Sequence, residues 1–225
     1  MKKTIRFLGG GMYHPADEQA ELIDGWLGPD RTIDNRDGRK AFEDLDEVDL
    51  FVVAGLHFTG MNQKEWPMEY APMTDADMDA FRDYVASGRP VLGFHGGVAS
   101  FDDRPEFRPL LGFYWNWLVT RHTPVGVWPM QPVDESTPVV RDVGGFETDD
   151  EIYYNLQVVP SLTNAQVHLW GFYHKMQTPL IMTAEGGRLE GAGKVAYFGL
   201  GHSMESMRPP EVKQLLLNTI DWLTD

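Results

Sequence analysis

Apolar runs alternate with amphipathic stretches along the first half of the chain. The runs at 4–8, 48–54 and 90–94 predict buried strands, because strands covered on both faces carry few polar residues. Between them, residues 16–27 and 74–88 place apolar side chains at helical spacing, and Thr74 with Asp77 forms a capping pair at the start of the second helix. Strands that alternate with helices predict an α/β fold with a mostly parallel sheet that is covered on both faces.

Shorter β-prone segments follow in the second half, at 124–128, 167–172 and 179–183. Residues 194–200 return to the pattern of a buried strand, and 211–223 form an amphipathic helix. No repeat of fixed period, low-complexity tract or Pro- or Ser-rich linker interrupts the sequence. We therefore expect one domain over residues 1–225.

The charge balance narrows the class of ligand. Nineteen basic and 34 acidic residues give a net charge of −15, which repels phosphate backbones and anionic lipids. A neutral or cationic small molecule therefore fits better than nucleic acid or a membrane surface, although the same charge also serves solubility. No stretch is apolar enough for a membrane helix, and the N-terminal apolar run is too short for a signal peptide, so we expect a cytoplasmic protein.

Histidines follow four of the predicted strands. His14, His57, His95 and His202 each come after a strand and a turn that contains glycine. The carboxyl ends of parallel strands lie along one edge of a sheet, and α/β sheets bind their ligands there. We therefore expect the four imidazoles to converge at that edge. The alternative for each of them is a structural imidazole that hydrogen-bonds neighbouring loops.

The segment VLGFHGGVAS (91–100) joins a predicted strand to a glycine-rich turn. Such a turn usually presents a Cys or Ser nucleophile, yet here His95 holds that place. Its imidazole can serve as a general base, a general acid or a metal ligand, or it can fill the former nucleophile pocket as a structural group. The chain has no cysteine, which excludes disulfides, thiolate nucleophiles and zinc–thiolate sites.

Four blocks occur along the chain in the order GGMYHP (10–15), GRPVLGFHGG (88–97), DDEIYYN (149–155) and KVAYFGLGHSMES (194–206), and a helix that ends in DWL follows. Together they resemble the ThuA-like, or trehalose-utilisation, family. The resemblance implies a flavodoxin-like, three-layer α/β/α sandwich, similar to the class I glutamine amidotransferases. The amidotransferase nucleophile falls on His95, so the resemblance implies the fold without glutaminase activity. The His-then-Glu element of those enzymes matches His202 and Glu205 only loosely, with a spacing one residue longer.

The acidic block adds a carboxylate to the predicted site. Asp150, Glu151 and Tyr153 match an Asp-Glu-x-Tyr element of the family, and Glu151 and Tyr153 share one face of a β-like segment. A carboxylate beside a phenol suits sugar hydroxyls or the orientation of a histidine, although adjacent carboxylates also occur on ordinary solvated surfaces. We expect His95, His202 and Glu151 to be catalytic. The expected substrate-binding residues are Tyr13, His14, His57, Gly96, Gly97, Tyr153 and Glu205.

The same histidines are candidates for a metal centre. Two or three of the histidines His14, His95 and His202, together with Glu151, would suit Zn²⁺ or Mn²⁺ and leave a position open for water. No short HxH or HExxH spacing occurs, so every ligand would come from a separate strand end.

A small sugar-derived molecule is the expected ligand, and the sugar link rests on the family resemblance alone. For an enzyme we expect isomerisation or elimination on an oxidised sugar by His/Glu acid–base catalysis, with a metal to polarise the carbonyl. The alternative is a non-catalytic binding module on a degenerate amidotransferase fold. Acid–base groups must lie within about 6 Å of one another around a shared cavity, which separates the two hypotheses. The aromatic run at 113–117 fits the core, a homo-oligomer interface or carbohydrate stacking.

Overall fold

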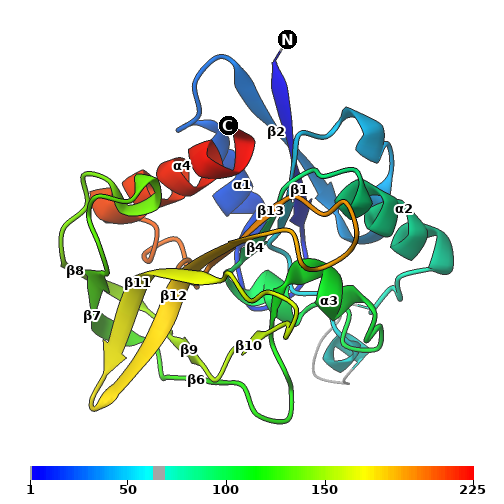
Figure 1. Cartoon of the computed structure of the whole chain (residues 1–225). Coiled ribbons are helices and arrows are strands. Elements are labelled where there is room, and N and C mark those ends of the chain that lie inside the picture. The colour runs from blue at the N-terminus through cyan, green and yellow to red at the C-terminus, as the bar shows by residue number, and fades with distance from the viewer. Residues whose placement is uncertain (1, 63–68) are drawn as a thin grey trace.

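A nine-stranded mixed sheet forms the centre of the computed structural model, which describes residues 2–62 and 69–225 (Figure 1). The strand order is β2-β1-β3-β4-β13-β12-β11-β7-β8; the first five strands pair in parallel and the remaining pairs are antiparallel. The parallel strands are β2 (Arg31–Asp37), β1 (Lys3–Gly9), β3 (Leu50–Val53), β4 (Val91–Phe94) and β13 (Lys194–Phe198). The antiparallel strands are β12 (Met176–Glu185), β11 (Gln166–Tyr173), β7 (Gly126–Pro132) and β8 (Phe146–Asp150). The α/β class is confirmed, and the β-prone segments of the second half make the sheet mixed.

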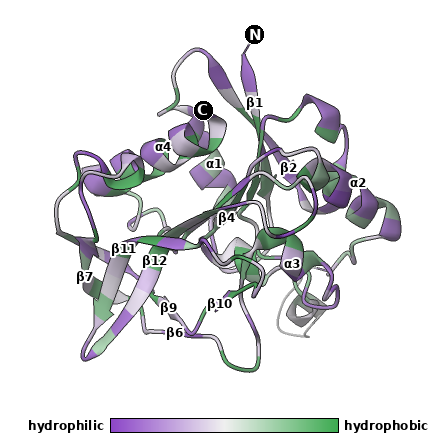
Figure 2. Ribbon diagram, in the orientation of Figure 1, coloured by the Kyte–Doolittle hydropathy of each residue, from purple (hydrophilic) through white to green (hydrophobic). Residues whose placement is uncertain are grey.

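Helices cover both faces of the sheet, as the three-layer prediction requires (Figure 1). Helices α1 (Ala16–Asp24) and α4 (Pro210–Thr224) share one buried hydrophobic cluster with the sheet. Helices α2 (Asp75–Ala86) and α3 (Phe107–Leu111) belong to a second cluster, formed with the opposite face of the sheet. In Figure 2, α2 and α4 carry both hydrophilic and hydrophobic residues, as amphipathic helices do. The α/β/α sandwich is therefore confirmed.

Short elements connect these layers. Two small antiparallel sheets pair β5 (Phe113–Tyr114) with β10 (Gln157–Val158), and β6 (Arg121–His122) with β9 (Tyr153–Tyr154). Single turns of 3₁₀ helix occur at η1 (Gly38–Phe42), η2 (Leu45–Glu47), η3 (Thr59–Asn62), η4 (His95–Ala99) and η5 (Pro138–Val140). Three of these pieces, η4, β6 and β9, lie at the candidate site described below.

The start of α2 follows from its sequence. The Thr74 hydroxyl accepts a hydrogen bond from the Asp77 backbone N–H at 3.2 Å, and the Asp77 carboxylate accepts one from the Thr74 backbone N–H at 2.8 Å. This reciprocal capping box satisfies two backbone donors that would otherwise lack partners in the first turn. The buried stripe of α2 consists of Met78, Phe81, Tyr84 and Val85, at the spacing expected from the sequence.

We expect Thr74→Ala to lower the free energy of unfolding by about 1 kcal/mol, the usual value of an N-cap side chain. Equilibrium unfolding in urea measures the difference. Thr74→Ser retains a hydroxyl at the cap and serves as the matched control. An unchanged stability of Thr74→Ala would show that the capping box contributes nothing to α2.

The structure differs from the sequence-based expectation at two places near the N-terminus. Helix α1 ends at Asp24, earlier than the predicted 16–27, and β2 was not predicted because its sequence RTIDNRD is almost entirely polar. Strand β2 is the edge strand beside β1 and therefore needs no apolar pattern. Arg6 of β1 is nonetheless buried; it pairs with Asp34 of β2 at 2.9 Å and donates hydrogen bonds to the carbonyls of Ala41 and Glu43.

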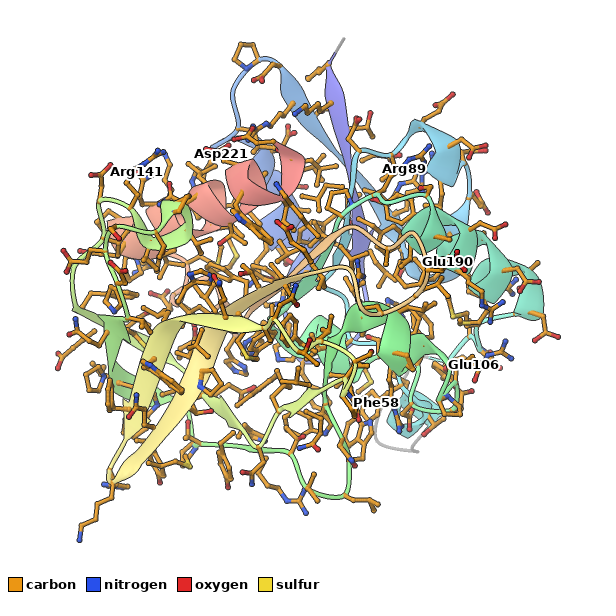
Figure 3. The ribbon with its side chains drawn as sticks, viewed as in Figure 1. Phe58, Arg89, Glu106, Arg141, Glu190 and Asp221 are labelled. Carbon is orange, nitrogen blue, oxygen red and sulfur yellow. The ribbon has the colours of Figure 1, made fainter. Side chains whose placement is uncertain are left out.

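Many charged side chains lie on the outside of the molecule. Glu106, Arg141 and Glu190, which are labelled in Figure 3, are exposed. Within the described part of the chain, no helix has the length and apolar character needed to span a membrane.

Candidate functional site

The turn that carries His95 has the sharp geometry predicted from its sequence. Strand β4 ends at Phe94, and His95 begins η4 with a φ of +39°, in the left-handed region. The following glycines are required by close approach: a Cβ on Gly97 would lie 2.0 Å from the carbonyl oxygen of Val53, and one on Gly96 would lie 2.2 Å from the His14 ring. The turn therefore presents the His95 imidazole at the carboxyl end of β4, with its side chain only 1% exposed.

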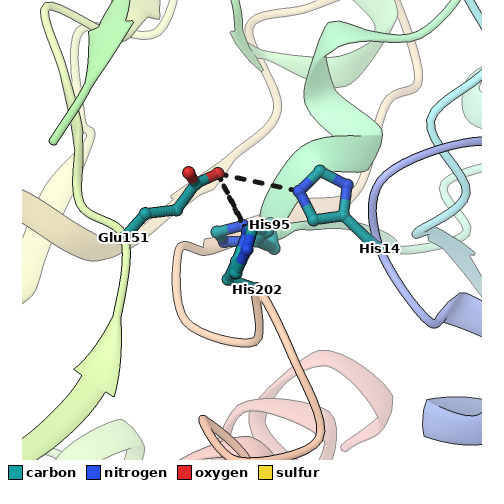
Figure 4. Close-up of side chains that lie close together, drawn as sticks. All are labelled: His14, His95, Glu151 and His202. Atoms are coloured by element: carbon teal, nitrogen blue, oxygen red, sulfur yellow. Dashed lines mark ion pairs between the residues drawn. The ribbon is translucent and has the colours of Figure 1, made fainter. Parts of the chain in front are cut away.

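Glu151 is the centre of a cluster of imidazoles (Figure 4). Its Oε1 atom lies 3.2 Å from Nδ1 of His202, 3.4 Å from Nε2 of His95 and 3.7 Å from Nε2 of His14. These residues come from separate connections, after β1, β4 and β13 and between β8 and β9. Ligand atoms of all four lie within 4.8 Å of one another. Three of the four histidines predicted at strand ends thus converge, together with the predicted carboxylate.

Asp150 holds two parts of this cluster together. Its buried carboxylate accepts hydrogen bonds from the backbone N–H groups of Gly201 at 2.8 Å, His202 at 3.1 Å and Glu151 at 2.8 Å. These hydrogen bonds connect the segment between β8 and β9 to the loop that follows β13. The sequence placed Asp150 in a family motif but did not indicate this positioning role.

The tautomer of His95 follows from its neighbours. Its Nδ1 lies 3.0 Å from the carbonyl oxygen of Gly199, which can only accept, so Nδ1 carries the hydrogen and donates it. In the neutral ring, Nε2, which faces the Glu151 carboxylate, therefore carries no hydrogen. Among residues 2–62 and 69–225, this nitrogen and Nδ1 of His202 are buried without a hydrogen-bond partner.

A fourth imidazole was missed from the sequence. Nδ1 of His122 lies 2.9 Å from Oε2 of Glu151 and 2.9 Å from the carbonyl oxygen of Thr123. His122 reaches this place because β6 pairs with β9, with His122 opposite Tyr153. Strands of two residues have no periodicity that a sequence reveals. The only available signal was a histidine close to the aromatic run at 113–117.

Burial and mutual contacts shift the protonation of the cluster. Burial lowers the pKa of His14 to about 4, so this imidazole is neutral at physiological pH. Burial by itself raises the pKa of Glu151. Contacts with His14, His202 and His95 outweigh burial, and the pKa of the Glu151 carboxyl lies well below its usual range. The Glu151 contact raises the pKa of His202. The centre therefore combines an ionised carboxylate with at least one neutral imidazole.

A pocket of about 540 Å³ opens above the cluster. Its floor is polar, whereas aromatic rings dominate its walls. Phe58 and Trp117 stack in parallel with 4.9 Å between ring centroids, and Trp117 and Tyr13 are partly exposed. The lining residues are Tyr13, His14, Leu56, Phe58, Ala99, Trp115, Trp117, His122, Glu151, Tyr153 and His202. His95 is not among them, because it lies beneath the floor.

Two of the expected site residues lie elsewhere. His57 turns away from the cluster: its Nε2 contacts the carbonyl oxygen of Gly9 at 2.8 Å, and it lines a separate cavity beside Asp37 and Arg39. Its backbone N–H is fixed by the Ser100 hydroxyl at 3.0 Å, which sets this direction. Glu205 is on the surface and pairs with Arg208, three residues further along the chain. His122, rather than His57, is the fourth imidazole at the site.

Gly96 and Gly97 belong to the site through their backbone. Gly96 packs against the ring of His14, and Gly97 packs against the end of β3. Neither is among the residues that line the pocket, and substrate contact by these two glycines stays a prediction. Tyr13, His14 and Tyr153, by contrast, line the pocket as expected.

A family model described as "Trehalose utilisation" (ThuA) matches residues 30–223. The chain belongs to the ThuA family. A structure from Parabacteroides merdae described as ThuA-like has a TM-score of 0.75 and 15% identity, over 100% of this chain and 90% of that one. Another ThuA-like structure, from Bacteroides uniformis, has a TM-score of 0.68 and 19% identity, over 99% of this chain and 91% of that one. No curated protein matches the sequence.

This ThuA family chain also shares the glutamine amidotransferase fold. A glutamine amidotransferase from Thermotoga maritima superposes with a TM-score of 0.50 and 8% identity, over 88% of this chain and 75% of that one. The likeness concerns the fold alone. His95 begins the turn after β4, where the family resemblance places the nucleophile, and the chain contains no cysteine. Thiolate attack on glutamine is therefore excluded for this member of the ThuA family.

Proposed function

We propose that this protein binds a small sugar-derived molecule in the aromatic pocket and catalyses proton transfer on it. The observation that carries the proposal is one carboxylate, Glu151, in contact with four imidazoles at the floor of a pocket of about 540 Å³. The reaction class is isomerisation or elimination next to a carbonyl of an oxidised sugar. The sugar class is supported by the family description, and the proposal includes a cytoplasmic location.

His122 is the group that we assign to move the proton. Its Nδ1–H faces two acceptors, Oε2 of Glu151 and the carbonyl of Thr123, so a neutral ring has its lone pair on Nε2. The ring lines the pocket and its side chain is 53% exposed, which gives substrate access to it. A base oriented by a carboxylate through its other nitrogen is the arrangement that general-base catalysis uses.

In the proposed reaction His122 accepts the proton from a carbon next to the carbonyl, and the electron pair of the broken C–H bond moves onto the carbonyl oxygen as an enolate. Tyr153 and His202 line the same floor and supply O–H and N–H groups near that oxygen. For isomerisation, the proton of the neighbouring hydroxyl moves to the enolate oxygen and His122 delivers its proton to the former carbonyl carbon, so that the hydroxyl-bearing carbon becomes the new carbonyl. For elimination, the enolate re-forms the carbonyl as a leaving group departs with its electron pair from the next carbon. His95 does not touch the substrate in this scheme and acts as a positioning residue.

The aromatic walls suit a sugar. Pyranose rings present apolar C–H faces that pack on aromatic side chains, and Trp117, Phe58 and Tyr13 offer such faces at the pocket. The net charge of −15 disfavours phosphorylated or other anionic substrates. A neutral sugar with one oxidised carbon therefore fits both the walls and the charge.

A ligand screen tests the binding part of the proposal. Thermal unfolding is measured with neutral disaccharides and with their keto derivatives. A ligand present at about 100 times its Kd stabilises the protein by about 2.7 kcal/mol, and we expect keto derivatives to be among those that stabilise.

Trp117→Ala should weaken binding about tenfold, equivalent to about 1.4 kcal/mol. Leu118→Ala is the matched control, because Leu118 is exposed and does not line the pocket. Equal losses in the two variants would contradict binding in this pocket.

A further inference from the structure

Three imidazole nitrogens point at one carboxylate oxygen. Oε1 of Glu151 faces Nδ1 of His202, Nε2 of His95 and Nε2 of His14 (Figure 4). Nε2 of His95 and Nδ1 of His202 are buried and make no hydrogen bond within the described residues, and His95 is 1% exposed. Buried polar atoms in native proteins almost always have partners, so these two require one.

One cation would supply a partner for both atoms. The Gly199 carbonyl fixes the hydrogen of His95 on Nδ1, so a neutral His95 directs a lone pair at a negatively charged oxygen 3.4 Å away. Two electron-rich atoms at this distance repel each other unless a positive charge lies between them. Protonating all three rings would place three positive charges within 4.8 Å of one another, which is strongly unfavourable in a buried site. A single metal ion satisfies every group at once.

We propose that His14, His95, His202 and Glu151 bind one Zn²⁺ ion at the floor of the pocket. This inference goes beyond the proposed function, because it concerns the resting protein and needs no sugar. Ligand atoms about 2.0–2.1 Å from Zn²⁺ in a tetrahedron lie about 3.4 Å apart. The distances from Oε1 of Glu151 to the three nitrogens are 3.2, 3.4 and 3.7 Å, close to that spacing, and all four ligand atoms lie within 4.8 Å of one another.

The donor set selects the class of metal. Imidazole nitrogens suit Zn²⁺ and its transition-metal neighbours, whereas Mg²⁺ and Ca²⁺ prefer oxygen ligands. Mn²⁺ should bind more weakly than Zn²⁺ at the same nitrogens. The surroundings also support the ligands: the Gly199 carbonyl orients His95, and His122 contacts the second oxygen of Glu151. His14, His202 and Glu151 line the pocket, so a bound ion would face a substrate.

Calorimetric titration of Zn²⁺ into chelator-treated protein, without any sugar, tests the site. We expect one Zn²⁺ per chain, weaker binding of Mn²⁺ and no measurable binding of Mg²⁺. His95→Asn and Glu151→Gln should each weaken Zn²⁺ binding by at least about 100-fold, because even outer partners of a metal site contribute about 10–100-fold. Asparagine is chosen at position 95 because it tolerates the positive φ of that residue.

His174→Asn is the matched control. His174 lies in the turn between β11 and β12, also at positive φ, and has no place in the cluster. It should leave the Zn²⁺ affinity unchanged, and circular dichroism confirms that each variant is folded. Stoichiometric Zn²⁺ binding that survives in both His95→Asn and Glu151→Gln, or absence of Zn²⁺ binding to the wild-type protein, would overturn the proposal. Because the titration contains no substrate, a failure of the sugar chemistry leaves its result unaffected.

Discussion

Glu151→Gln should slow proton transfer at this site by about 10²–10⁴-fold, the range that a positioned acid–base group contributes. The carboxylate orients His122 through Oε2 and faces three further imidazoles through Oε1. An amide has the same shape, but it carries no charge and keeps only one acceptor oxygen. The measurement is the rate at which the protein exchanges the C–H hydrogens beside the carbonyl of a keto disaccharide for deuterium, followed by NMR in D₂O.

The same substitution should also lower the free energy of unfolding, by up to about 3–5 kcal/mol, because removing one partner of a buried charged cluster leaves the other groups uncompensated. Glu205→Gln is the matched control for the rate, since Glu205 is a surface residue that pairs with Arg208. A purely structural role for the cluster predicts that folded Glu151→Gln protein alters the exchange rate no more than Glu205→Gln does.

Gly97→Ala should lower the free energy of unfolding by about 3 kcal/mol, which lies at the upper end for overpacking a core. The added Cβ would lie 2.0 Å from the carbonyl oxygen and 2.4 Å from the carbonyl carbon of Val53. These are backbone atoms of a buried strand between β1 and β4, so they cannot rotate away as a side chain would. Relief of the clash requires β3 and the turn after β4 to separate.

Gly144→Ala is the matched control for this effect. A Cβ at Gly144 would meet no atom within 4 Å, and the stability of this variant should change by less than about 0.5 kcal/mol. Urea unfolding of the two variants beside the wild-type protein gives the comparison. Equal stabilities for Gly97→Ala and Gly144→Ala would contradict the close packing that sets the His95 turn.

The sequence predicted the parts of the site that depend on parallel strands. His14, His95 and His202 follow β1, β4 and β13, and the shared edge of a parallel sheet brings such positions together. Glu151 was predicted from the family motif and not from this rule. It lies between β8 and β9, each of which pairs in antiparallel fashion with another strand. The strand order that brings Glu151 to the same edge of the sheet as the histidines cannot be predicted from local sequence patterns.

The positions of His57 and His122 depend on contacts that local sequence patterns do not predict. His57 follows β3 as the rule requires, but the Ser100 hydroxyl and the Gly9 carbonyl direct it to another cavity, and neither contact is local in sequence. His122 enters the site through the pairing of two strands of two residues each. Such pairing depends on tertiary packing, so the sequence alone offered no reason to include it.

Deuterium exchange by the wild-type protein decides whether the imidazole cluster transfers a proton on a keto sugar. A keto disaccharide that stabilises the protein against thermal unfolding is incubated with it in D₂O, and the C–H signals beside the carbonyl are followed by NMR. We predict that the protein accelerates their loss, and that His122→Asn and Glu151→Gln each remove most of this acceleration. If a ligand binds in the pocket but its C–H hydrogens exchange no faster than in buffer, proton transfer by the cluster is contradicted. The protein would then be a non-catalytic binding module.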